Sequence, residues 1–173
     1  MKISFRSCYS IFDKIAYFLN DYLKVDLQPN EVTFRKVWYK KGNHKPPELN
    51  PLLLDSQNWA LRGLFWLSKE LNTNETEFSS QMLPESSQLV SIRNFIEHKS
   101  IMVVEIGESR LVHEGKTFQI TRGDLISKTL ILMKMARAAT MYLSFAIHIE
   151  EKKTPHSQTV PIYMHKILQQ FKT

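Results

Sequence analysis

Apolar residues in this chain recur at spacings of three and four far more often than they alternate, which predicts helices. We expect a first helix from about Arg6 to Val25. Its apolar stripe is formed by Ile11, Ile15, Phe18 and Tyr22. A second helix is predicted from about Asp55 to Leu71, capped by Asp55 or Ser56. Its apolar face is wide enough to indicate burial on more than one side and comprises Leu61, Leu64, Phe65, Trp66 and Leu67.

Three further helices complete the predicted bundle. The third opens at Pro84 and Glu85, runs to about Ile106 and stops at Gly107. A long helix follows from about Arg122 to Glu151, with Thr121 as its cap, and a short one follows Pro161. Between the first and second helices, VTFRKVWY predicts a strand or brief helix and HKPPELNP a loop. Between the third helix and the long one, residues 109–120 predict a small hairpin around Gly115.

The chain is therefore predicted to be all-α, a compact bundle of about five helices with a small hairpin near 109–120. Its 173 residues suit one domain spanning 1–173, and neither a repeat nor a linker divides them. A single cysteine, Cys8, fits a reducing compartment, and the amino terminus lacks the apolar core of a secretory signal, so we expect a cytoplasmic protein. The most apolar window, 125–149, contains Lys128, Lys134 and Arg137, which favours a core helix over a membrane span.

The net charge of +6 is compatible with a polyanionic partner such as RNA. The clearest basic cluster is FRKVWYKKGNHK, residues 34–45, where aromatic residues alternate with lysines. A solvated surface loop is the simpler interpretation of that cluster.

The stretch SIRNFIEHKS, residues 91–100, carries the candidate chemistry. On a helical projection at about 100° per residue, one arc of the predicted third helix is apolar and comprises Leu89, Ile92, Phe95, Ile96, Met102 and Val103. The opposite arc comprises Asn94, Glu97, His98, Ile101 and Glu105. Arg93 lies at the border, so an exposed helix face with an Arg93–Glu97 ion pair is one interpretation. Ile101 on the polar arc favours a second buried surface, such as a dimer interface.

These side chains suit cleavage of RNA without a metal. The imidazole of His98 can take or return a proton, and the guanidinium of Arg93 can hold a phosphate and stabilise its charge. Asn94 could orient either group, and the ribose 2′-OH would attack the adjacent phosphorus. An arginine–histidine pair at this spacing arises by chance with a probability of roughly one in four, so it needs structural context.

No metal or cofactor is expected at other positions. His113, His148, His156 and His165 have no spacing typical of a zinc site, and no cysteine pair accompanies them. Gly107, Gly115 and Gly123 are too isolated for a phosphate-binding loop.

With Arg93 and His98 enclosing N-F-I-E, the chain resembles the HEPN superfamily of small helical domains. Active members of that superfamily carry an arginine, four to six residues and a histidine, commonly with a polar residue after the arginine. The segments YSIFDKIAYFLNDYL, VTFRKVWY and NWALRGLFWLSKEL are similar to those of a HEPN subgroup found at the carboxy end of longer proteins with helical repeats. The likeness covers most of the chain.

The resemblance implies a homodimer in which Arg93, Asn94 and His98 of both copies build one ribonuclease cleft. Glu97 and Lys99 lie beside the motif, and supporting and RNA-contact roles are expected for them. Ser100 stands where one HEPN branch has a tyrosine that receives a nucleotide, which puts such silencing in doubt.

The expected function is that of a metal-independent endoribonuclease, a toxin or antiphage effector, with RNA, a second copy and an antitoxin or regulatory domain as partners and no membrane association. A noncatalytic helical module that binds RNA or protein is the alternative. A monomeric scaffold with Ile101 exposed is a third.

Overall fold

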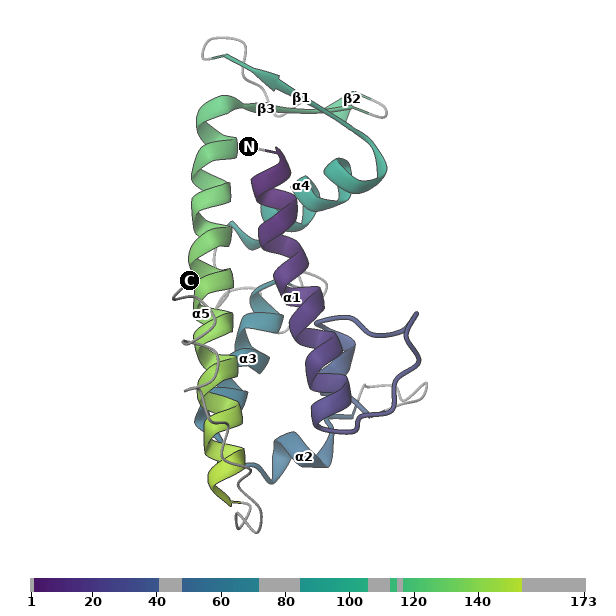
Figure 1. The fold of residues 1–173 in the computed structure, drawn as a ribbon. Helices are drawn as coiled ribbons and strands as arrows, with labels where there is room; N and C mark the ends of the chain where they lie inside the picture. Colours follow the sequence, from purple (N-terminus) through teal and green to yellow (C-terminus); the bar gives the residue numbers. More distant parts are fainter. Residues whose placement is uncertain (1, 41–47, 72–84, 106–112, 115–116, 154–173) are drawn as a thin grey trace, which may run out of the picture.

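The structure is a computed structural model that describes residues 2–40, 48–71, 85–105, 113–114 and 117–153 (Figure 1). Its helices are α1 Lys2–Tyr22, the 3₁₀ turn η1 Lys36–Trp38, α2 Pro51–Leu54, α3 Trp59–Glu70, α4 Ser86–His98 and α5 Arg122–Lys153. Its strands are β1 Ser100–Val104, β2 His113–Glu114 and β3 Thr117–Thr121. The expectation of an all-α bundle with a small hairpin is confirmed: α1 and α3 pack along α5, and the sheet caps one end.

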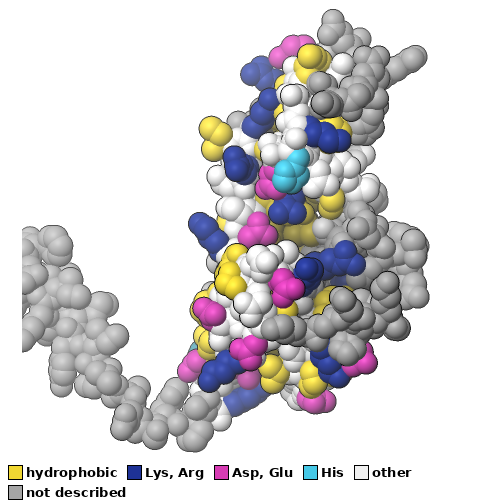
Figure 2. Space-filling view, turned by 90° about the vertical axis from the view of Figure 1, so that its right-hand side faces the viewer, with side chains coloured by type: hydrophobic (Ala, Val, Ile, Leu, Met, Phe, Trp, Pro, Cys, Tyr) yellow, Lys and Arg dark blue, Asp and Glu magenta, His cyan; other side chains and the backbone are white. Residues whose placement is uncertain are grey.

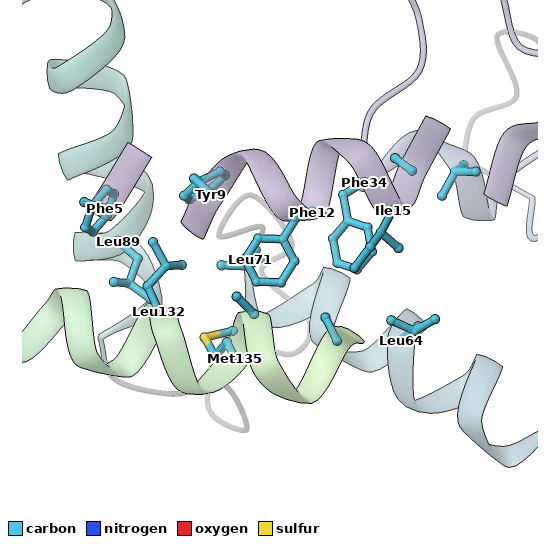
Figure 3. Packing of buried hydrophobic residues seen from close by; sticks show 14 of the residues in the cluster. Phe5, Tyr9, Phe12, Ile15, Phe34, Leu64, Leu71, Leu89, Leu132 and Met135 are labelled. Atoms are coloured by element: carbon cyan, nitrogen blue, oxygen red, sulfur yellow. The ribbon is translucent and has the colours of Figure 1, made fainter. Parts of the chain in front are cut away.

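The core lies between α1 and α5. Phe5, Tyr9 and Phe12 recur one helical turn apart on α1, and Figure 3 shows Phe12 pointing toward Leu71 and Met135. The predicted stripe is confirmed in part: Ile15 is buried and Ile11 packs partly buried against the core, whereas Tyr22 is half-buried and Phe18 is 40% exposed. The helix begins at Lys2, four residues earlier than predicted, and the large aromatic residues of its first turns take the buried side.

Helix α3 is capped by Asn58, whereas Asp55 ends α2, so the predicted cap at Asp55 or Ser56 was wrong. The Asn58 side chain accepts a hydrogen bond from the Leu61 backbone N–H at 3.1 Å, as an N-cap should. Burial on more than one side was also overestimated. Trp59 and Trp66 are more than half exposed, although α3 packs on α5 and the Trp59 ring lies 6.2 Å from the Tyr142 ring of that helix.

The largest correction concerns the predicted third helix, which ends at His98 as α4 instead of continuing to Ile106. Lys99 is extended, and Ser100–Val104 form β1, paired in parallel with β3. The helical arcs beyond His98 were consequently wrong: Met102 is 51% exposed and Val103 39%. Ile101 is buried within the single chain at 9% exposure, opposite Phe118 in the ladder, so it gives no reason to expect a dimer.

The remaining predictions fared better. β2 and β3 pair antiparallel, as the hairpin near 109–120 required. Thr121 caps α5: its hydroxyl accepts from the Asp124 N–H at 3.1 Å and donates to the Asp124 carboxylate at 2.7 Å. The segment VTFRKVWY contains the brief helix η1. The helix expected after Pro161 lies outside the described residues.

Helix α5 differs on its two sides. By length and composition it is apolar enough to cross a membrane. One side builds the core expected of it, through Leu125, Leu132, Met135 and Ala139. The other side keeps large apolar residues exposed, so burial alone does not account for the composition of this helix.

Candidate active site at the end of helix α4

The candidate residues lie on the last turns of α4, which packs on α1 and on β1. Buried Leu89, Ile92 and Phe95 anchor one side of the helix, and Phe95 stacks on Phe118 of β3 with ring centroids 4.9 Å apart. This anchoring leaves Arg93, Glu97 and His98 on the outward side. Figure 2 shows a histidine on this face with acidic and basic side chains next to it.

Arg93 is positioned by α1 as much as by its own helix. Its guanidinium carbon lies 4.6 Å from the centre of the Tyr9 ring, a cation–π arrangement. Nη2 lies 3.7 Å from the Asp13 carboxylate, and Nε lies 3.5 Å from the Glu97 carboxylate. The Arg93 side chain is 34% exposed, and its buried Nε has no hydrogen-bond partner.

The Glu97 carboxylate lies near both motif residues, Arg93 and His98. It lies 3.5 Å from Arg93 Nε and 3.9 Å from Nε2 of His98. The imidazole itself is 73% exposed, and solvent can reach it directly. The predicted supporting role for Glu97 thus has a definite geometry: one carboxylate within reach of both the cation and the candidate acid–base group.

Two residues of α1, Tyr9 and Asp13, belong to the site although sequence reasoning missed them. Burial raises the pKa of Tyr9 to about 12; Arg93 lowers it, while Asp13 and Glu97 raise it. Burial also raises the pKa of Asp13, and Glu97 adds to that rise while Arg93 opposes it. The Tyr9–Asp13 spacing of four residues places both on one face of α1. Nothing local in the sequence joins that face to Arg93.

The other predicted residues are less closely connected. Asn94 is exposed on α4, one residue after Arg93. Lys99 is exposed at the end of the helix, and its ammonium lies 4.8 Å from the centre of the Phe95 ring. The structure therefore brings together Arg93, Glu97 and His98, while Asn94 and Lys99 border them.

Two of the three aromatic residues in the basic cluster 34–45 are buried and cannot contact a ligand. Phe34 and Trp38 are buried, and the Trp38 indole N–H donates to the Phe34 carbonyl at 2.6 Å. Because these two rings belong to the core, they cannot stack on RNA bases. The simpler interpretation, a segment whose basic side chains are solvated, is therefore favoured. Residues 41–45 lie outside the described part of the chain. Within the described ranges no group of three or more His, Cys, Asp or Glu side chains is placed to hold a metal ion.

Chemically, the site combines one fixed cation, an imidazole and two carboxylates. Arginine offers five N–H donors in a planar fork that fits a phosphate, and here the neighbouring carboxylates orient that fork from distances longer than hydrogen bonds. The side chain of Arg93 is partly exposed, so an anionic ligand can reach part of its guanidinium but not the buried Nε. The same two carboxylates weaken the local positive potential, so RNA would have to compete with them.

Comparison with known proteins bears on the family. No curated protein and no solved structure matches the chain. The LA2681-like HEPN family matches residues 1–150, which include every helix of the described bundle except the last three residues of α5, and all residues of the candidate site. The chain belongs to the LA2681-like HEPN family.

Proposed function

We propose that this protein is a metal-independent endoribonuclease. The observation that carries the proposal is the Glu97 carboxylate between Arg93 and His98 at the end of α4, in a chain of the HEPN family, whose domains are often ribonucleases. Arg93 would bind the scissile phosphate through the exposed part of its guanidinium. His98 would exchange protons with the reacting oxygens, and Asn94 would orient the phosphate or the imidazole.

The proposed reaction needs no water as nucleophile. The ribose 2′-oxygen forms a bond to the adjacent phosphorus while the bond from phosphorus to the 5′-oxygen breaks. The 2′-OH proton passes to a base, and the departing 5′-oxygen receives a proton from an acid. The products are a 2′,3′-cyclic phosphate and a 5′-hydroxyl, and DNA is resistant because it lacks the 2′-OH.

A composite site at a homodimer is part of the proposal. One imidazole cannot be base and acid in the same displacement, so two copies of His98 would supply the two protonation states. Two points support the dimer: this chemical requirement and the exposure of His98. Ile101 adds no support, since it is buried inside the single chain. Dimerisation would also bring a second Arg93 to the phosphate.

The cellular role that fits such an activity is that of a toxin or antiphage effector in the cytoplasm, held in check by an antitoxin or a regulatory domain. Uncontrolled RNA cleavage harms the cell that makes the enzyme. The proposal includes no cofactor and no membrane association.

The direct test compares wild-type protein with His98→Ala on total cellular RNA and maps the cleaved ends. We expect cyclic phosphate ends with wild type and a loss of rate of about 10²–10⁴-fold with His98→Ala. His148→Ala is the matched control, since His148 is also an exposed helical histidine but lies on α5. Intact RNA at high wild-type concentration, or equal cleavage by both variants, would refute the proposal.

A noncatalytic RNA-binding or protein-binding module is the second candidate, and one observation favours it. Asp13 and Glu97 together carry two negative charges beside the single charge of Arg93, an arrangement that also serves a structural ion-pair network. RNA binding without cleavage, unchanged by His98→Ala, would establish this alternative.

A further inference from the structure

Helix α5 carries a row of exposed apolar side chains, the outer stripe of α5, formed by Ile126, Leu130, Met133, Met141 and Phe145. Each is between 41% and 52% exposed. At about 100° per residue they share an arc of about 120°, and at a rise of about 1.5 Å per residue they extend over about 28 Å. Trp59 of α3 continues the surface, since its ring lies 5.8 Å from that of Phe145.

Two cations lie inside this arc. The helical projection places Arg137 between Leu130 and Met133, and Lys134 between Met141 and Phe145. Both are exposed, and neither forms a salt bridge with any other residue that the structure describes. Other cations of the same helix do have such partners: Lys128 lies 3.9 Å from Glu85 and Lys153 lies 2.9 Å from Glu150.

The positions of these cations argue against three occupants of the stripe. A second copy of α5 would bring the Lys134–Arg137 pairs of both chains together, because the pair lies near the middle of the stripe. A lipid surface favours cations at the flanks of an apolar face, not at its centre. RNA would find only two cations on the stripe, and the aromatic residues that could stack bases, Phe145 and Trp59, lie together at one end of it, about 12 Å or more along the helix from Arg137 and Lys134.

We propose that the outer stripe of α5 binds an amphipathic helix of a partner protein that places two carboxylates against Lys134 and Arg137. Apolar residues at helical spacing on both surfaces would bury one another, and the carboxylates would neutralise cations that are otherwise buried with the stripe. The charges would set the register and the choice of partner more than the affinity. This proposal concerns binding alone and stands whether or not the protein cleaves RNA.

The test is a selection with the full chain from a displayed library of helical peptides. Each peptide has a fixed leucine stripe and randomised residues at its neighbouring positions. We expect Asp and Glu to be enriched about tenfold over Lys and Arg at the positions that meet Lys134 and Arg137. The selected peptides should bind Met133→Gln Met141→Gln protein about tenfold more weakly, because two of the five apolar side chains of the stripe are replaced by polar ones.

Charge reversal supplies the decisive comparison. Lys134→Glu Arg137→Glu should enrich Lys and Arg in place of the acids, whereas Arg35→Glu Lys36→Glu, the same charge change at an exposed site outside α5, should not. Leu52→Gln Leu54→Gln is the matched control for the apolar change, since both leucines are exposed on α2. Circular dichroism checks that each variant keeps its helices.

Three results would overturn the proposal. The first is a selection with no acidic preference. The second is a dimer, detected by light scattering, that Met133→Gln Met141→Gln dissociates, since a second copy would then cover the stripe. The third is binding to phosphatidylglycerol vesicles that the same variant abolishes.

Discussion

Asn58 and Arg93 each connect two helices through polar side chains, but their surroundings differ. Asn58 is fully buried, and its amide donates to the Ala146 carbonyl and to the Glu150 carboxylate, both at 2.8 Å. Arg93 is partly exposed, its nearest carboxylates lie at 3.5 and 3.7 Å, and its Nε has no hydrogen-bond partner. A buried amide with complete hydrogen bonds holds the fold together, whereas a partly exposed guanidinium whose carboxylate neighbours lie beyond usual hydrogen-bond distance is suited to a ligand.

The largest effect is expected when Arg93 is changed while its charge is kept, which tests whether Arg93 serves a ligand and not the fold. Arg93→Lys should lower the cleavage rate about 100-fold, because an ammonium cannot hold a phosphate with two parallel hydrogen bonds. The free energy of unfolding should change by less than about 1 kcal/mol, since the ion pairs are partly exposed. Single-turnover cleavage and urea unfolding measure the two effects, and Arg62→Lys on α3 is the matched control. A large loss of stability with little loss of rate would make Arg93 a structural residue.

Asn58→Ala should show the opposite pattern. Removing the amide deletes the cap of α3 and leaves the Ala146 carbonyl buried without this donor, which we expect to lower the free energy of unfolding by roughly 2–3 kcal/mol. Urea unfolding measures it. The control is Asn50→Ala, which removes only the cap of the four-residue helix α2 and should cost less than about 1 kcal/mol. Equal effects of the two substitutions would contradict the distinction drawn for Asn58.

A smaller effect is expected at Tyr9, which supports Arg93 from α1. Tyr9→Leu retains an apolar side chain but loses the ring beneath the guanidinium, so the cleavage rate should fall roughly five- to tenfold, equivalent to about 1 kcal/mol. Tyr9→Phe keeps the ring and should cleave at nearly the wild-type rate. If both variants lose activity equally, the ring does not position Arg93.

The smallest expected effect is on how the free energy of unfolding depends on pH. Asp13, beside Arg93, and Glu150, beside Asn58, should contribute with opposite signs. Because burial raises the pKa of Asp13, its contribution to stability is complete below about pH 4 and is lost as the pH rises through the raised value. Burial also acts to raise the pKa of Glu150, but hydrogen bonds from Lys153 and Asn58 outweigh it and the pKa is lowered. Its contribution is present above about pH 4 and is lost as the pH falls through the lowered value.

Urea unfolding at pH 3 and pH 7 tests these signs. Relative to wild type, Asp13→Asn should gain stability between pH 3 and pH 7, and Glu150→Gln should lose it. Each change should stay below about 1 kcal/mol, because water reaches both carboxylates. If the stability of both variants changed in the same direction between pH 3 and pH 7, a raised pKa for Asp13 and a lowered pKa for Glu150 could not both hold.

Most helices could be predicted because their signals are local. The apolar periodicity of α5 and the reciprocal hydrogen bonds between Thr121 and Asp124 involve neighbours in sequence. The strand β1 could not be predicted in this way. Ile-Met-Val-Val continues a helical pattern acceptably, and its pairing with residues 117–121 decides between helix and strand.

In the candidate site, too, residues close in sequence could be predicted and residues joined only by packing could not. Arg93 and His98 follow from the motif spacing on one helix, and Glu97, expected only as a supporting residue beside the motif, lies on the same helix. Asp13 and Tyr9 come from a helix about eighty residues earlier, and only the packing of α1 on α4 brings them to Arg93. Ile101 shows the reverse error: placed on the wrong element, it suggested an interface where the chain buries it against β3.

The end of α4 has a mechanical consequence. Lys99 alone separates His98 from β1, and β1 pairs along its whole length with β3, which runs directly into α5 at Arg122. The end of α4 is therefore linked to the start of α5 through the hydrogen bonds between β1 and β3. Arg93 in turn contacts Tyr9 and Asp13 of α1. His98 therefore lies where α1, the sheet and the start of α5 are mechanically linked.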